Sequence, residues 1–186
     1  MTTVRKDPLQ VRLSGRGGQG VILAGVLVSE AAMLDGMHVV QTQSYGPEAR
    51  LGAAKAEVVL SSRPIAFPEV VEPDILLCLS QDAYVKYGQA LAAGGLRLVD
   101  ERVASEVEVG DALLLPLVAT ANQIEAPIAA NVVALGALVG LTEIVSLGSL
   151  RAAMRERIKP AFLELNERAL EAGLGLGIRY PVFGAQ

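Results

Sequence analysis

Near its start the chain reads Leu9-Gln10-Val11-Arg12-Leu13-Ser14-Gly15-Arg16-Gly17-Gly18-Gln19-Gly20, and the following run to Asp35 is almost wholly apolar until Glu30. Residues 9–14 predict a strand, and the next run predicts a helix packed on both sides because it lacks a polar face. Four glycines in six residues let the backbone reach positive φ and let another surface approach closely. A strand, a glycine turn and a helix N-terminus together suit phosphate or another anion. The candidate ligand-binding residues of this turn are Gly15, Gly17, Gly18, Gln19 and Gly20.

The glycine spacing also fits the fingerprint of dinucleotide-binding folds. Such a site places an acidic residue about 20 positions beyond the glycines, at the end of the second strand, to bind the ribose hydroxyls. Here residues 41–44 read Gln-Thr-Gln-Ser, and Asp35 comes before the strand. NAD and FAD are therefore disfavoured, while another phosphate-bearing ligand stays open. In the alternative interpretation, the glycines only let the first helix pack tightly on its strand.

Length and composition favour one compact domain. The chain has 186 residues, of which 52% are hydrophobic, and its net charge is -4. This is enough for one sizeable core, and the acidic balance argues against nucleic acid as a partner. The most apolar segment, residues 126–141, is shorter than the roughly 20 residues of a membrane span and contains Pro127 and Asn131. We expect a cytoplasmic chain without a membrane span or a signal peptide, part of whose apolar surface is covered by partner subunits or by a second copy.

The chain has one cysteine and one histidine. Cys78 lies in the apolar run 75–79, which predicts a buried strand. A single cysteine excludes an intrachain disulfide and a self-contained iron–sulfur site. His38 stands at the start of a predicted strand, and one histidine makes no metal constellation. We therefore expect no metal site on this chain.

Strand and helix signals alternate in the first part of the chain. They predict a three-layer α/β/α fold, with a Rossmann-like, mostly parallel sheet. Beyond residues 9–14, strands are expected at 37–42, 55–60, 74–80, 96–100 and 113–117. The strand at 37–42 is expected to run parallel to the first in a β-α-β unit. The strand at 55–60 is expected to have one wetter face, and Pro116 places the last strand at a sheet edge.

The remaining segments are predicted to be helical or irregular. Helices are expected at residues 81–92, 121–124, 128–141, 149–158 and 160–172, and an irregular connection at 61–73. The chain is therefore divided as one domain, 1–186, with a sheet part at 8–118, a helical part at 119–173 and a glycine-rich tail at 174–186. The tail is expected to be frayed or held on a partner.

A second candidate segment, the polar loop 43–52, follows the predicted strand 37–42. Arg50 suits a carboxylate or a phosphate, and Tyr45 suits stacking. No histidine or glycine elbow accompanies Ser44, which argues against a serine nucleophile. In the alternative interpretation the loop is only a rigid turn, in which Pro47 fixes φ and Glu48 pairs with Arg50. The candidate residues of this loop are Ser44, Tyr45, Gly46, Pro47, Glu48 and Arg50.

Residues 15–25, the Ser-Tyr-Gly-Pro-Glu-Ala-Arg run at 44–50 and residues 131–138 occur in an order that resembles the gamma subunit of 2-oxoacid:ferredoxin oxidoreductases. The resemblance covers nearly the whole chain and is greatest to the 2-oxoglutarate branch; the family includes domain III of pyruvate:ferredoxin oxidoreductase. One departure is Leu51, because the family usually has two glycines after the arginine.

The resemblance implies a division of labour between subunits. Thiamine diphosphate would lie between alpha and beta subunits, and iron–sulfur clusters on beta or delta subunits would pass electrons to ferredoxin. The complex would convert a 2-oxoacid and coenzyme A to an acyl-CoA and CO2. The gamma chain would carry no catalytic residue, cover the active site and contact coenzyme A. Pyruvate, branched-chain and aryl 2-oxoacids remain alternative substrates, and a nucleotide-binding module or a purely structural assembly subunit remains an alternative role.

The glycine turn and the polar loop are predicted to lie together at the carboxyl ends of adjacent parallel strands, where ligands of α/β folds bind. A separation above about 15 Å, several strand spacings, would rule out a shared site. A further hypothesis assigns the phosphates of coenzyme A to the amides of residues 17–20 and to Arg50.

Overall fold

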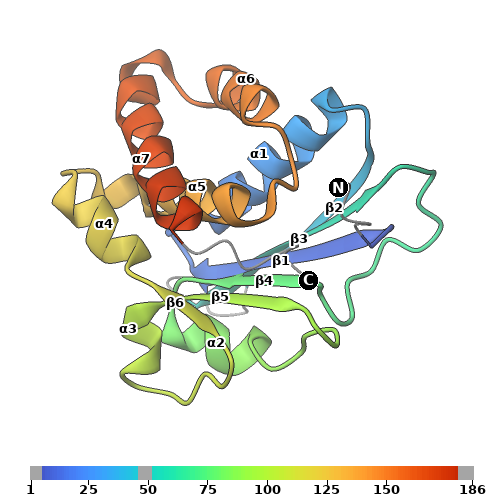
Figure 1. Ribbon diagram of the computed structural model, residues 1–186, viewed down its shortest axis with the longest axis horizontal. Helices are drawn as coiled ribbons and strands as arrows, with labels where there is room; N and C mark the ends of the chain where they lie inside the picture. The colour runs from blue at the N-terminus through green and yellow to red at the C-terminus, as the bar shows by residue number, and fades with distance from the viewer. Residues whose placement is uncertain (1–5, 46–51, 180–186) are drawn as a thin grey trace.

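The computed structural model describes residues 6–45 and 52–179, which form a six-stranded mixed sheet with helices on both faces (Figure 1). The strand order is β2-β3-β1-β4-β5-β6. The strands are β1 (Leu9–Arg16), β2 (His38–Tyr45), β3 (Ala53–Ser61), β4 (Ile75–Cys78), β5 (Leu96–Asp100) and β6 (Leu113–Leu115). Strands β1, β4, β5 and β6 are mutually parallel. The predicted three-layer α/β class is confirmed.

Strand β3 corrects the predicted strand arrangement. It pairs antiparallel with both β1 and β2, so β2 has the direction of β1 but is not its neighbour. Every residue of β3 except Lys55 is buried, so the predicted wetter face is wrong. The buried Glu57 is satisfied by Arg12 of β1, whose Nε lies 2.7 Å from Glu57 Oε1, and by Lys55. This pairing explains how a charged strand can occupy the interior of the sheet.

The helices follow the predicted pattern with shifted ends. They are α1 (Val21–Leu34), α2 (Gln81–Tyr87), α3 (Glu101–Ala104), α4 (Leu117–Gln123), α5 (Ala130–Thr142), α6 (Leu147–Arg157) and α7 (Pro160–Ile178), with a 3-10 turn η1 (Pro127–Ala129). Helix α2 is shorter than expected: it ends at Tyr87 and is followed by Gly88, whose amide donates a hydrogen bond to Tyr84 O. Helix α3 was not predicted, and it is capped by the side chain of Asp100.

The helices form two layers of unequal size. Helices α1, α5, α6 and α7 cover one face of the sheet, and α2 and α3 lie on the other face (Figure 1). Helix α5 is almost completely buried, as its lack of a polar face predicts. Within residues 6–45 and 52–179, none of the helices has the length and apolarity that a membrane crossing needs.

Helix α7 continues to Ile178, through residues that were predicted to be a glycine-rich tail. The glycines are explained by a close approach of α7 to α5. A Cβ on Gly173 would lie 2.0 Å from Val133 O, and one on Gly177 would lie 2.5 Å from Ala137 O. The tail prediction is therefore wrong as far as Ile178, because these glycines serve helix packing. The part of that tail from residue 180 onward lies outside the described residues.

Candidate functional site

The glycine turn joins the carboxyl end of β1 to the first residue of α1. Gly18 and Gly20 have φ values of 92° and 74°, in the left-handed region that favours glycine. Gly20 occupies the N-cap position of α1 and has no side chain to cap the helix. The amides of the first helical turn therefore have no acceptor within α1. This arrangement presents amide donors and the positive end of the helix dipole at one edge of the sheet.

Gln19 holds the turn together. Its Oε1 accepts a hydrogen bond of 2.6 Å from the amide of Arg16, and its own amide donates to Arg16 O at 3.0 Å. Its Nε2 donates to Leu79 O, just beyond the end of β4, at 3.4 Å. These hydrogen bonds of Gln19 join it to other residues of the chain, and they fix the shape of the turn.

The turn and the polar loop meet at the carboxyl end of β1. The amide of Gly17 donates a 2.8 Å hydrogen bond to Gly52 O. Gly15 and Tyr45 both face Ala54 from opposite sides of β3, so they are about 10 Å apart. The predicted proximity is confirmed, whereas the predicted adjacency of the two strands is wrong because β3 lies between them.

Several residues of the predicted polar loop lie outside the part of the chain that the structure describes. Gly46, Pro47, Glu48 and Arg50 lie outside the described residues, as does the side chain of Tyr45. Ser44, which precedes them in β2, is half-buried and pairs in register with Lys55 of β3.

The turn offers fewer free amides than the sequence predicted. The amides of Gly17 and Gln19 are bonded to Gly52 O and Arg16 O. Among residues 6–45 and 52–179, the amides of Gly18 and Gly20 donate to no protein acceptor. The folded turn uses the amides of Gly17 and Gln19 internally, so the amides of Gly18 and Gly20 are the donors that remain for a phosphate, and phosphate binding by the turn stays a prediction.

Asn131 is a residue of this site whose role the sequence did not reveal. It is buried in the first turn of α5, and its Nδ2 donates a 3.1 Å hydrogen bond to Gly20 O. A Cβ on Gly20 would lie 2.6 Å from the same Nδ2 atom. Asn131 therefore fixes the start of α1 against α5, from 111 residues away in the sequence.

Arg16 adds an exposed cation to the same edge. Its Nε and Nη2 lie 3.2 and 2.9 Å from Asp82 Oδ2, in the first turn of α2. The Arg16 and Asp82 side chains are 49% and 50% exposed. A charged residue inside a glycine turn is the sequence signal that could have identified Arg16.

Two carboxylates near these elements have structural roles. Asp100, fully buried at the end of β5, accepts hydrogen bonds from the amides of Arg102 and Val118 and so caps α3 and orders the start of α4. Asp35 follows the last residue of α1, about 21 Å along the helix from the glycine turn. It accepts hydrogen bonds from Ser146 and Ser149 at the start of α6. Asp35 is therefore too far from the turn to bind a ribose there.

The cysteine is buried at the end of β4, and the histidine lies at the start of β2. Cys78 is buried in β4, as predicted; burial raises the pKa of its thiol, and its Sγ lies 3.2 Å from Ser80 O. His38 is exposed at the start of β2, near the opposite edge of the sheet. Among the described residues, no group of three or more His, Cys, Asp or Glu side chains is placed to hold a metal ion.

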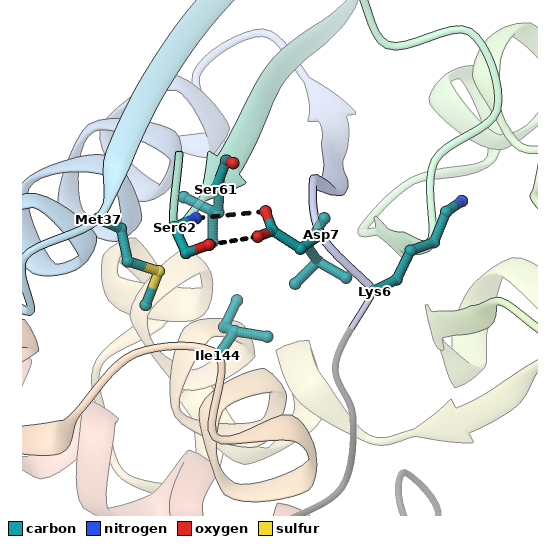
Figure 2. Close-up of a pocket in the computed structure, with 8 residues that line it drawn as sticks. Lys6, Asp7, Met37, Ser61, Ser62 and Ile144 are labelled. Carbon is teal, nitrogen blue, oxygen red and sulfur yellow. Dashed lines mark hydrogen bonds between the residues drawn. The ribbon is translucent and has the colours of Figure 1, made fainter. Parts of the chain in front are cut away.

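A cavity of about 220 Å³ lies at the opposite edge of the sheet (Figure 2). It is lined by Lys6, Asp7, Leu9, Met37, Leu60, Ser61, Ser62 and Ile144. Asp7 accepts hydrogen bonds from the amide and the hydroxyl of Ser62, and bonds from Ser62 and Ser61 hold the pKa of Asp7 below its ordinary value. Leu9 begins β1, about 24 Å along the strand from Arg16. This cavity contains none of the predicted site residues.

A family model described as pyruvate ferredoxin/flavodoxin oxidoreductase matches residues 10–176. The chain belongs to this family. The resemblance to the gamma subunits of 2-oxoacid:ferredoxin oxidoreductases is therefore confirmed, and the turn, the loop and residues 131–138 all lie within the matched region.

Members of this family agree with the chain in sequence and in fold. The 2-oxoglutarate synthase subunit KorC of Methanocaldococcus jannaschii is 50% identical over 171 residues, which cover 88% of this chain and 91% of the relative. The structure of a keto/oxoacid ferredoxin oxidoreductase gamma subunit from Geobacter sulfurreducens matches with a TM-score of 0.80 and 40% identity, covering 92% and 99% of the two chains.

A more distant structure shows the same fold inside a longer chain. The 2-oxoglutarate:ferredoxin oxidoreductase of Magnetococcus marinus, solved with 2-oxoglutarate, coenzyme A and succinyl-CoA bound, matches with a TM-score of 0.86 at 23% identity. The match covers 98% of this chain and 32% of the other chain. The fold of this chain thus also occurs as one part of a polypeptide about three times as long.

Proposed function

We propose that this chain is the gamma subunit of a cytoplasmic 2-oxoglutarate:ferredoxin oxidoreductase and that its carboxyl edge contacts coenzyme A beside an active site on partner subunits. The observation that carries the proposal is the hydrogen bond between Gly17 and Gly52, which joins the glycine turn to the polar loop. Ligands of α/β folds bind at this edge of the sheet. Family membership and the name of the Methanocaldococcus jannaschii relative support the substrate.

The residues of this edge fit the anionic part of coenzyme A. The amides of Gly18 and Gly20 and the first turn of α1 offer donors for a phosphate oxygen. Arg50, in the loop joined to the turn, would add a positive charge that binds a phosphate through two parallel hydrogen bonds. Asn131 and Gln19 hold these donors in place through the bonds described above.

The decarboxylation and the electron transfer are assigned to cofactors on the partner subunits. Thiamine diphosphate supplies carbanion stabilisation, and iron–sulfur clusters carry electrons toward ferredoxin. One buried cysteine cannot supply the four thiolates that such a cluster requires, so this chain does not hold one alone. The contribution of this chain is to orient coenzyme A and to exclude water.

The partner that this chain would contact is suggested by the Magnetococcus marinus enzyme. In that enzyme the same fold occupies about a third of one polypeptide, so the rest of that polypeptide is covalently linked to it. A separate subunit equivalent to that remainder would pack against this chain. The exposed apolar side chains of Ile128, Met33 and Phe67 leave surface for such contacts.

The coenzyme A contact is tested by titrating the assembled complex with coenzyme A. Arg50→Ala is expected to weaken binding by about 1 to 3 kcal/mol, the range for a hydrogen bond to a charged group. Arg63→Ala is the control, because Arg63 is 77% exposed and follows β3 at the opposite edge. An affinity for coenzyme A that is the same in the wild type and in Arg50→Ala would remove Arg50 from the site.

The substrate is tested by comparing kcat/KM for 2-oxoglutarate, pyruvate, a branched-chain 2-oxoacid and an aryl 2-oxoacid in the same complex. We expect the highest value for 2-oxoglutarate. A higher kcat/KM for any of the other three acids would assign the complex to that acid.

A further inference from the structure

We propose that Arg16 binds a phosphate group of coenzyme A and that Asp82 holds its guanidinium in position for that contact. This inference rests on the proposed function. Arg16 ends β1 and stands inside the glycine turn, one residue from Gly17 and two from Gly18. Its amide and its carbonyl oxygen are both bonded to Gln19, so its backbone is fixed relative to the free amides of the turn.

The geometry of the ion pair leaves part of the guanidinium open. Nε and Nη2 of Arg16 both donate to one oxygen of Asp82, Oδ2, at 3.2 and 2.9 Å. These bonds occupy the side of the guanidinium that carries Nε. Within the described residues, Nη1 has no protein acceptor, so the edge formed by Nη1 and Nη2 faces no described partner. That edge is the one through which arginine binds a phosphate with two parallel hydrogen bonds.

The pair is exposed, so a ligand can reach the guanidinium. Arg16 is 49% exposed and Asp82 is 50% exposed, and ion pairs of this kind contribute little to folding stability. Asp82 orients the guanidinium, but its negative charge also opposes an approaching phosphate. Removal of Arg16 and removal of the Asp82 charge should therefore have different effects on the affinity for coenzyme A.

The test is calorimetric titration of the assembled complex with coenzyme A and with pantetheine, which lacks the nucleotide and its phosphates. Arg16→Gln is expected to raise the Kd for coenzyme A about tenfold, the loss of one charge-assisted contact, and to leave the Kd for pantetheine unchanged. Asp82→Asn keeps an oxygen acceptor for the guanidinium and removes only the charge, so it is expected to leave the Kd for coenzyme A unchanged or to lower it. Asp82→Ala removes the acceptor that positions Arg16 and is expected to raise that Kd.

Arg157→Gln is the matched control. Arg157 is 52% exposed, and its Nε and Nη2 also contact a single carboxylate oxygen, that of Glu30. It lies on α6 and pairs with the C-terminal half of α1, away from the glycine turn. The Kd values for both ligands are expected to match those of the wild type.

Two results would overturn the assignment. One is an unchanged Kd for coenzyme A in Arg16→Gln; the other is an equal increase in Arg16→Gln and Asp82→Asn, which would mean that the pair is only a structural tie. If Arg16→Gln does not assemble, Arg16→Lys replaces it, with an expected increase of about threefold because lysine keeps the charge but not the two-bond edge. An unchanged Kd in that variant would equally contradict the assignment.

Failure of the inference can be told apart from failure of the proposed function. If Arg50→Ala weakens coenzyme A binding and Arg16→Gln does not, only the role of Arg16 is wrong. If neither variant changes the Kd for coenzyme A, neither arginine is part of the site, and the proposed contact is then left with the amides of Gly18 and Gly20 alone.

Discussion

The contact between α5 and α7 predicts that two neighbouring glycines will respond oppositely to the same substitution. A Cβ on Gly173 would lie 2.0 Å from Val133 O and 2.9 Å from the Ala137 amide nitrogen. These are backbone atoms, which cannot rotate away as a side chain can. Gly175, half a turn along the same helix, has no atom within 4 Å of the position of an added Cβ. Gly175→Ala is therefore a control for the intrinsic effect of alanine in α7.

The magnitudes follow from this geometry. To restore an ordinary contact with Val133 O, the two backbones would have to separate locally by about 1.4 Å. Overpacking of a close-packed interior costs about 1 to 3 kcal/mol, whereas alanine gains about 0.5 to 1 kcal/mol over glycine within a helix. Gly173→Ala should therefore lower the free energy of unfolding by about 2 kcal/mol, because the clash is with backbone. Gly175→Ala should raise it by about 0.5 to 1 kcal/mol.

Urea unfolding of the purified chain, followed by circular dichroism, measures both values. The expected order of the midpoints is Gly175→Ala, then wild type, then Gly173→Ala. In thermal melts, Gly173→Ala should lower Tm by about 4 to 8 °C, at 2 to 4 °C per kcal/mol for a chain of this size. If Gly173→Ala is as stable as the wild type or more stable, α7 does not approach α5 as closely as the structure shows.

Three further perturbations test other parts of the molecule. Asn131→Ala removes the hydrogen bond to Gly20 O and should lower the free energy of unfolding by about 1 to 2 kcal/mol. It should also raise the Kd for coenzyme A, and an unchanged Kd would show that Asn131 does not organise the turn. Arg12→Met leaves the buried Glu57 with Lys55 as its remaining partner and should lower the free energy of unfolding by about 3 kcal/mol, the lower end of the range for a broken buried ion pair. Replacing both Arg12 and Glu57 by apolar residues should cost much less, and equal losses in urea unfolding of the single and double variants would contradict the buried pair. Burial raises the pKa of Asp35, but hydrogen bonds from Ser149 and Ser146 outweigh this effect, so the pKa in the folded chain lies below the ordinary value of 3.8. The stability that Asp35 contributes is therefore present above pH 3.8 and is lost as the pH falls through the lower folded pKa. The Tm difference between the wild type and Asp35→Asn should shrink between pH 5 and pH 3, and a constant difference would refute this role.

Local signals in the sequence were enough to predict most helices and strands. Strand β5 was predicted with its observed bounds, because a five-residue segment that follows a glycine turn is long enough for a strand and too short for a typical helix. Helix α1 was predicted to within one residue, because its almost wholly apolar composition starts after Gly20 and ends near Gly36. These features depend on neighbours in the sequence, which are visible without a structure.

Features that depend on distant residues were missed. The insertion of β3 between β1 and β2 depends on strand order, and the burial of Glu57 depends on Arg12, 45 residues away. The glycines of α7 resembled a tail because their contact with α5 is not encoded in local spacing. Each missed feature is a tertiary contact that overrides a local preference.

In the candidate site, too, features set by neighbouring residues were predicted and features set by distant residues were missed. Its backbone turn was found from the glycine pattern, and its position beside the loop was predicted from the rule that ligands bind at the carboxyl ends of parallel strands. The roles of Asn131 and of the pair between Arg16 and Asp82 could not be found in this way, because their partners lie far apart in the sequence. The number of free amides also required the structure, since the folded turn uses the amides of Gly17 and Gln19 internally.

We propose that the glycine turn and the loop joined to it bind coenzyme A in the assembled enzyme. The most direct measurement is a structure of the complete complex with coenzyme A bound. We expect a phosphate oxygen within hydrogen-bond distance, about 2.7 to 3.2 Å, of the amide of Gly18 or Gly20. Coenzyme A phosphates held entirely by other subunits, more than about 10 Å from the turn and so beyond two strand spacings, would contradict it.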